Sequence, residues 1–135
     1  MKLYTSYFAR VKKLQEAGYN NLVCVAGYAP KFFFDIPDAR FMSELAPKRC
    51  WWRVWHDKFK DNLNSQESIE WYTNIYRDTV LSNLNSTNVV EELGDNAVML
   101  CYEKSGDFCH RHLIADWITK NTGITVEEVD FSKQN

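Results

Sequence analysis

Apolar residues recur along the chain with two different spacings, and the change of spacing marks the predicted elements. The run from Ala97 to Glu103 is short and mostly apolar, which is typical of a strand buried on both faces. The turn Lys104-Ser105-Gly106 follows, and the apolar positions then take helical spacing, at Leu113, Ile114, Trp117 and Ile118. Asp107 is a good N-cap for this helix. We therefore predict a strand, a tight turn and a helix.

The same patterns predict three more strands. They cover Lys2–Ser6, Asn21–Ala26 and Ile124–Val129, the last at or near an edge of the sheet. A helical pattern from Phe8 to Leu14 separates the first two, and this order indicates a parallel strand–helix–strand unit. We predict an α/β fold, in which residues 1–135 form a single small domain with a mostly parallel sheet of about four strands flanked by helices.

Other segments between the second and third strands have helical patterns. Asp38–Leu45 is predicted to be a short helix that ends before Pro47. Asn64 and Glu67 resemble a capping box that opens the longest helix, which runs to about Leu84. Residues 85–93 are predicted to form a loop and one or two helical turns.

The segment from Cys50 to Phe59 is rich in tryptophan. Its apolar stripe has helical spacing, which is typical of a helix face buried on a core or of a lid, at Trp52, Trp55, His56 and Phe59. The alternative is that these aromatic residues, interleaved with Arg49, Arg53, Lys58 and Lys60, stack on a nucleic acid strand or a nucleotide base. The net charge of −2 favours the buried helix face.

Composition excludes several classes of protein. With 15% aromatic and 25% charged residues the chain is globular, and without a basic excess it disfavours nucleic acid as a partner. We find no secretory signal and no membrane-spanning stretch, so we expect a cytoplasmic protein that does not contact membranes.

The four cysteines are unevenly placed, and structural disulfides are not expected. No glycine-rich phosphate loop or other motif identifies a cofactor or an oligomeric state.

In a parallel sheet all strands end at the same rim, where open α/β folds usually bind their ligands. Three loops should meet there. The residues that we expect to contact a ligand from the first two loops are Thr5, Ser6, Tyr7 and Tyr28.

The third loop leads into a helix start with three basic residues, His110, Arg111 and His112, at the end where the helix dipole disfavours cations. Together with free backbone N–H groups, a guanidinium there is a receptor for phosphate or carboxylate. The alternative is that Arg111 pairs with Glu103 or Asp107 and merely braces the turn.

Three chemistries are compatible with this loop. Cys109, near a helix start and basic neighbours, is a candidate thiolate nucleophile. Glu103 and His110 are candidates for acid–base catalysis. A zinc site has suitable ligand types in Cys101, Cys109, His110 and His112, but it lacks a Cys-X-X-Cys pair, and adjacent helical residues point about 100° apart. We therefore predict no metal site.

The sequence resembles the domain of unknown function family 488. The resemblance is carried by Cys101-Tyr102-Glu103, by Cys109-His110-Arg111 and by Asp116-Trp117, with agreement at Tyr4–Phe8 and Val25–Pro30. It implies a small α/β domain and no established reaction. We expect the protein to bind a small anionic, nucleotide-like ligand at the rim. Binding alone, hydrolysis of the ligand and transfer of a group from it are all compatible with the sequence. The alternative is a non-enzymatic module that binds protein or nucleic acid, with the Cys-His-Arg turn as scaffold.

Overall fold

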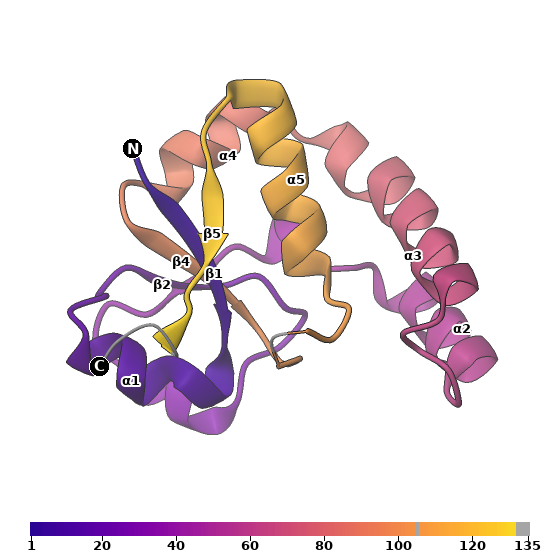
Figure 1. Cartoon of the computed structure of the whole chain (residues 1–135), viewed down its shortest axis with the longest axis horizontal. Coiled ribbons are helices and arrows are strands. Elements are labelled where there is room, and N and C mark those ends of the chain that lie inside the picture. Colours follow the sequence, from indigo (N-terminus) through magenta and orange to yellow (C-terminus); the bar gives the residue numbers. More distant parts are fainter. Residues whose placement is uncertain (105, 132–135) are drawn as a thin grey trace.

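The α/β fold is confirmed by a computed structural model that describes residues 1–104 and 106–131. One sheet of five parallel strands has the order β3-β2-β4-β1-β5 (Figure 1). The strands are β1 (Leu3–Tyr7), β2 (Leu22–Cys24), β3 (Arg40–Phe41), β4 (Ala97–Cys101) and β5 (Val126–Glu128). Ser105, in the predicted turn, and the last four residues of the predicted domain lie outside the described residues.

The predicted number of strands was one too low, because β3 spans only two residues. The predicted helix at Asp38–Leu45 is wrong. Its first half contains β3, which pairs with β2, and its second half is the 3₁₀ turn Ser43–Leu45. Two residues are too few to show the alternation by which a strand is detected in a sequence. The prediction of a last strand at the edge is confirmed by β5, which pairs with β1 alone.

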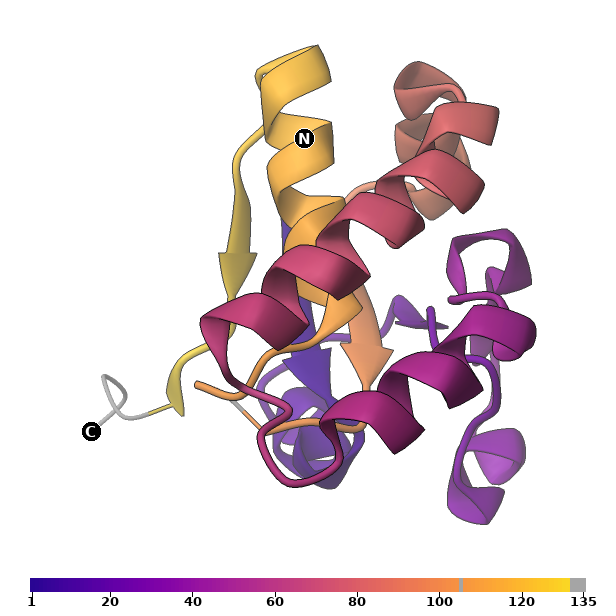
Figure 2. The ribbon, with the colours of Figure 1, turned by 90° about the vertical axis from the view of Figure 1, so that its right-hand side faces the viewer.

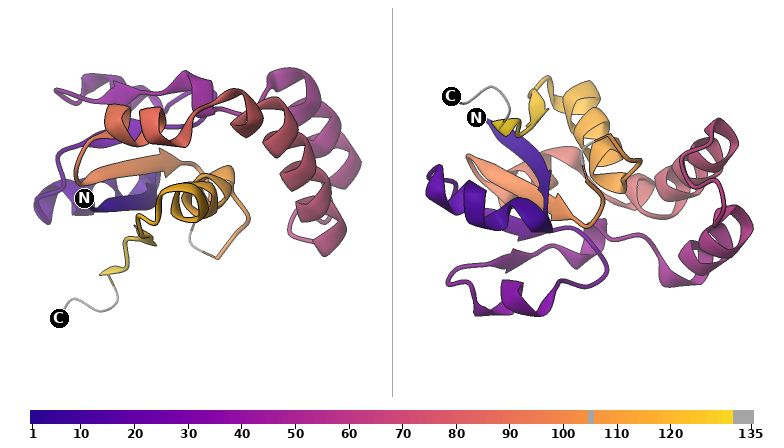
Figure 3. Two further views of the ribbon diagram at one scale, coloured as in Figure 1. Left: turned by 90° about the horizontal axis from the view of Figure 1, so that it is seen from above. Right: turned by 60° about the horizontal axis from the view of Figure 1, so that its bottom comes forward.

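Helices cover both faces of the sheet. They are α1 (Val11–Glu16), α2 (Arg49–Phe59), α3 (Gln66–Thr79), α4 (Ser86–Leu93) and α5 (His110–Thr122), and further short 3₁₀ turns include Phe8–Arg10, Lys31–Asp35 and Leu81–Asn83. The sheet lies between α1 and α5 (Figure 3). Helices α2 and α3 pack side by side (Figure 2). Both project to one side of the sheet, on the right in Figure 1.

Two apolar clusters fill the two faces of the sheet, because successive strand residues point to opposite sides. Val23 and Met99 belong to the cluster under α5, and Leu22 and Val98 belong to the cluster that includes Val11 of α1. No helix within the described residues has both the length and the apolar character needed to cross a membrane.

The buried face of α2 includes Trp55 and Phe59 of the predicted stripe but not Trp52, and His56 is only half-buried. Trp51, Trp55 and Phe59 are buried, whereas Trp52 is 37% exposed. The neighbouring helix α3 explains the difference, because the ring of Trp51 meets that of Tyr72 and its Nε1 donates a hydrogen bond to Thr79 Oγ1 at 2.9 Å. Trp52 is therefore left at the surface, next to the rim.

The start of α5 also differs from the prediction. Its N-cap is Cys109, in an extended conformation, and not Asp107. The preceding Phe108 donates its backbone N–H to Asn64 Oδ1 at 2.9 Å and packs against Tyr72. These contacts hold Phe108 to the α2–α3 pair, so the helix begins two residues later than Asp107 would allow. Asn64 is thereby occupied, and Ser65 caps α3 instead.

Candidate functional site

A pocket of about 140 Å³ opens at the rim, where β2 and β4 end beside α2 and α5. Half of its lining residues are Phe, Trp or Tyr, and four predicted site residues lie in it: Tyr28, Glu103, Cys109 and His110. The full lining is Ala26, Tyr28, Pro47, Trp52, Trp55, Tyr72, Cys101, Tyr102, Glu103, Phe108, Cys109 and His110. The loops that follow β2 and β4 meet at the rim because parallel strands all end at the same edge of the sheet.

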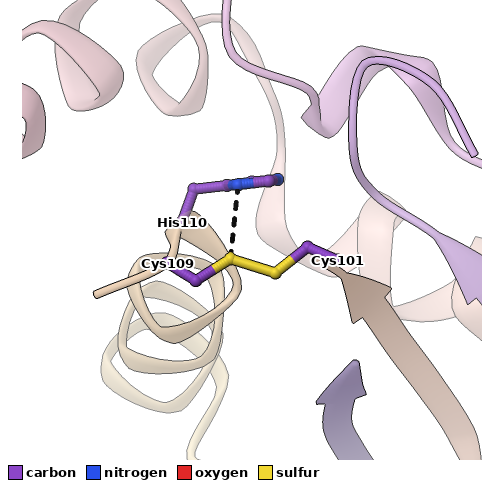
Figure 4. A group of neighbouring side chains, drawn as sticks. All are labelled: Cys101, Cys109 and His110. Carbon is purple, nitrogen blue, oxygen red and sulfur yellow. Dashed lines mark hydrogen bonds between the residues drawn. A yellow bond between two sulfur atoms is a disulfide. The ribbon is translucent and has the colours of Figure 1, made fainter. Parts of the chain in front are cut away.

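Two of the lining residues form a disulfide, which joins Cys101 at the end of β4 to Cys109 at the start of α5 (Figure 4). The expectation of no disulfide is therefore wrong. The loop between the two cysteines leaves the sheet and returns to it, so that residues only eight positions apart face one another at the rim. In this state Cys109 has no free thiol, and its role as a nucleophile stays a prediction for the reduced protein.

His110 is buried beside this disulfide. Its Nε2 lies 2.7 Å from the carbonyl oxygen of Val25. Since a carbonyl can only accept, Nε2 carries the proton, and Nδ1 presents a lone pair 3.8 Å from Cys109 Sγ. Burial lowers the pKa of His110 to about 4, and the nearby Arg111 acts in the same direction. The ring is therefore neutral at pH 7.

Arg111 is not available to an external ligand. Its side chain is wholly buried, and Nε and Nη2 form a bidentate ion pair with Glu128, at 3.0 and 2.8 Å. Nη1 donates to the carbonyl oxygen of Glu103 at 2.7 Å and contacts Cys101 Sγ at 2.9 Å. This geometry corrects the prediction that Arg111 receives an external anion, and it supports the alternative that Arg111 braces the turn. The acidic partner of Arg111 is Glu128 on β5, which is neither of the two predicted partners.

The three predicted ligand contacts on β1 do not line the pocket. Thr5 donates its hydroxyl hydrogen to Glu128, and the ring of Tyr7 lies under the guanidinium of Arg111. Ser6 is fully buried, and its hydroxyl has no hydrogen-bond partner among the described residues. Thr5 and Tyr7 thus belong to the surroundings of the Arg111–Glu128 pair.

Glu103 stands at the mouth of the pocket. The residue is exposed, but its carboxyl group is partly desolvated, and this raises its pKa, while Arg111 acts in the opposite direction. A carboxylate with a raised pKa at a pocket is suited to proton transfer. His112, another basic residue of this helix start, is half-buried, and burial lowers its pKa.

A second hollow, of about 550 Å³, adjoins the pocket and shares Tyr28, Pro47 and Trp52 with it. Its other lining residues are Gly27, Arg49 and Arg53. The two arginines did not appear among the predicted site residues. The signal that could have found them was the interleaving of arginine with tryptophan, which was set aside as part of a buried helix face.

The chain matches the model of a known family. The family model described as the active DUF488-N3 subclade matches residues 7–122. This confirms the family resemblance given by the sequence. No match was found among curated proteins or among solved structures.

Proposed function

The chain belongs to the DUF488-N3 subclade, and from this membership and the rim pocket we propose that it binds a small anionic ligand with a flat ring, such as a nucleotide. One observation carries the proposal. The aromatic pocket and the hollow with Arg49 and Arg53 share the wall formed by Tyr28 and Trp52, so a ring and an attached anionic group fit side by side.

The ring lies in the aromatic pocket. A volume of about 140 Å³ is close to that of an engineered cavity that accepts benzene, about 150 Å³. Three exposed aromatic side chains border it, Tyr28, Trp52 and Tyr102, and the rings of Tyr28 and Tyr102 are 5.2 Å apart. Stacking on such side chains contributes about 1–3 kcal/mol per base.

The anionic group lies against Arg49 and Arg53. These residues are one turn apart on α2 and exposed, and neither forms a salt bridge within the described residues. The first turn of α2 contains no acidic residue, so the positive end of the helix dipole adds to the attraction. Guanidinium groups bind phosphate and carboxylate oxygens in bidentate geometry.

The reaction class that fits this site is hydrolysis of the bound ligand or transfer of a group from it. Glu103, at the mouth of the pocket, accepts the proton of a water or a ligand hydroxyl. Cys109 serves as a nucleophile only after the disulfide is reduced. We place the protein in the cytoplasm, where thiol pools keep most cysteine pairs reduced.

A thermal-shift screen tests the proposal. Nucleoside mono- and diphosphates, sugar phosphates and inorganic phosphate are added to the wild type, to Trp52→Ala and to Arg53→Ala. The matched controls are Val54→Ala and Lys60→Ala, which change exposed residues of α2 and its C-cap outside both hollows. A nucleotide at 100 times its Kd stabilises the fold by about 2.7 kcal/mol.

We expect nucleotides to raise the melting temperature of the wild type and of both controls, and to do so less in Trp52→Ala and Arg53→Ala. Inorganic phosphate alone should have a smaller effect than a nucleotide, because it lacks the ring. A screen in which no small anion raises the melting temperature would contradict the proposal. A shift produced only by an oligonucleotide would favour the alternative of an interaction module.

A further inference from the structure

We propose that the reduced chain binds a zinc ion through Cys101, Cys109 and His110. A thiol reductant supplies two electrons and two protons to the disulfide, which becomes two thiols. Zinc then displaces both thiol protons, and the two thiolates and the His110 Nδ1 lone pair become its ligands. The oxidised and the zinc-bound states exclude one another, because the same two sulfur atoms form either one disulfide bond or two bonds to the metal.

The three ligand atoms already lie together. Cys101 Sγ, Cys109 Sγ and one His110 ring nitrogen are within 4.8 Å of one another, and all three residues are buried (Figure 4). With Zn–S of about 2.3 Å and Zn–N of about 2.1 Å, tetrahedral geometry places sulfur and nitrogen ligands about 3.6 Å apart. The distance between Cys109 Sγ and His110 Nδ1 is 3.8 Å. This pair therefore needs little movement to take up a metal.

The sequence argument against a metal site assumed that Cys109 and His110 are both helical. Cys109 is instead the extended N-cap of α5, with φ −150° and ψ 146°. The 100° rotation between successive helical residues does not apply across this junction, so the two side chains converge on one point. His112, the fourth candidate from the sequence, does not belong to the group.

The surroundings of the three residues are those of a metal site. Metal-binding histidines commonly donate their other ring N–H to a carbonyl or carboxylate, which fixes the tautomer that coordinates. His110 Nε2 does so to the carbonyl of Val25 at 2.7 Å. On the other side, Nη1 of Arg111 lies 2.9 Å from Cys101 Sγ and can donate a hydrogen bond to a metal-bound thiolate. Glu128 holds this guanidinium in place.

The fourth coordination position faces the pocket, because all three ligands line it. Structural zinc sites have four protein ligands, whereas catalytic sites have three and leave one position for water or substrate. Cys101, Cys109 and His110 correspond to the second kind. Glu103, which also lines the pocket, is a candidate to receive a proton from a zinc-bound water. This inference does not rest on the proposed nucleotide function, since zinc alone tests it.

The experiment is a zinc titration of the wild type in two states, fully reduced with a phosphine and oxidised to the disulfide, without any nucleotide. We expect one equivalent of zinc to bind the reduced protein and none to bind the oxidised one. Cobalt(II) in place of zinc should give the intense visible bands of tetrahedral thiolate coordination. Bound zinc should slow alkylation of Cys101 and Cys109 and leave the exposed Cys50 reactive.

Variants identify the ligands. Cys101→Ser, Cys109→Ser and His110→Ala should each weaken zinc binding by more than the roughly 10- to 100-fold that losing an outer-shell partner costs. Cys50→Ser, which removes an exposed free cysteine, should bind like the wild type. Reduced wild type that takes up no zinc at micromolar metal would overturn the proposal. So would zinc binding that persists in Cys101→Ser and Cys109→Ser, or cobalt spectra without thiolate bands.

Discussion

The rim of the sheet has two halves, and they differ in whether their arginines are buried and paired or exposed to solvent. In the closed half, formed by Thr5, Tyr7, Arg111 and Glu128, a wholly buried guanidinium is paired inside the protein. In the open half, formed by Tyr28, Trp52 and the two arginines of α2, the cations are exposed beside an aromatic pocket. Both halves have basic residues at a helix start.

The difference shows that an unfavourably placed cation does not by itself identify a ligand site. A charge removed from water needs a partner, and for Arg111 the protein provides one from β5. Arg49 and Arg53 remain in water and have no acidic partner among the described residues, so they are available to a ligand. The predictions below test this contrast, from the largest expected effect to the smallest.

The largest effect is expected from breaking the closed half. Glu128→Gln removes the charge that faces Arg111 and leaves a buried, uncompensated guanidinium. Loss of one partner of a buried pair costs 3–5 kcal/mol, and since Glu128 is 23% exposed we expect about 3 kcal/mol. Urea unfolding measures this loss. The matched control Glu127→Gln, at the exposed neighbouring position, should change stability by less than about 0.5 kcal/mol.

The double variant Arg111→Met/Glu128→Met sharpens this result. Replacing both members of a buried pair by apolar residues is often close to neutral, so the double variant should be more stable than Glu128→Gln. If Glu128→Gln unfolds at the same urea concentration as the wild type, the ion pair does not brace the rim and the contrast between the halves fails.

The next largest effect is a pH dependence of stability from His110. Its pKa is about 4 in the folded protein and about 6.5 when unfolded, so the unfolded chain binds the proton first as the pH falls. The free energy of unfolding should therefore decrease between about pH 6.5 and pH 4, by up to about 3 kcal/mol. Urea unfolding of the oxidised, metal-free protein across this range measures it.

The control for this prediction is His110→Asn, which should keep only the part of the slope that comes from half-buried His112, whose pKa burial also lowers. His56→Gln, a change on α2, should keep the slope of the wild type. A wild type whose stability is the same at pH 4.5 and pH 6.5 would show that His110 is not held neutral by burial.

A smaller effect is expected from the open half. Arg53→Ala removes an exposed cation next to Trp52 and should weaken binding of a nucleotide by about 1 kcal/mol, because solvent screens the contact. Stability should change little, since no ion pair of Arg53 is lost. Calorimetry at two salt concentrations measures the affinity, and the wild type should lose more affinity at high salt than Arg53→Ala does. Equal losses would show that Arg53 does not contact the anionic group.

The smallest effect is expected at Ser6. Its buried hydroxyl lacks a partner among the described residues, so Ser6→Ala removes a desolvated polar group and should be neutral or stabilising by up to about 1 kcal/mol. Nucleotide affinity should be unchanged, because Ser6 lies outside the pocket lining. Thermal unfolding and calorimetry measure both quantities. A loss of nucleotide affinity in Ser6→Ala would show that β1 contributes to the ligand site.

The sequence predicted the features that depend on local spacing. The buried strand that became β4, the helix that follows it and the edge position of β5 all follow from apolar periodicity and turn residues. The parallel sheet then brought Tyr28, Glu103, Cys109 and His110 to one pocket.

The features that were missed depend on contacts between distant segments. Glu128 is 17 residues from Arg111, and no local pattern shows that β5 brings the two together. The contact between Phe108 and Asn64, 44 residues apart, moved the start of α5 to Cys109. That shift turned a cysteine expected in a helix into a residue that faces both Cys101 and His110.

The most direct test of the two halves is a calorimetric titration with the nucleotide that most raises the melting temperature in the screen. Three proteins are compared: the wild type, Trp52→Ala and Arg111→Met/Glu128→Met. We predict that the double variant keeps the Kd of the wild type, whereas Trp52→Ala loses the stacking contribution, about 1–3 kcal/mol or roughly 5- to 150-fold in Kd. Unchanged binding by Trp52→Ala together with lost binding by the double variant would contradict the assignment of the ligand to the open half.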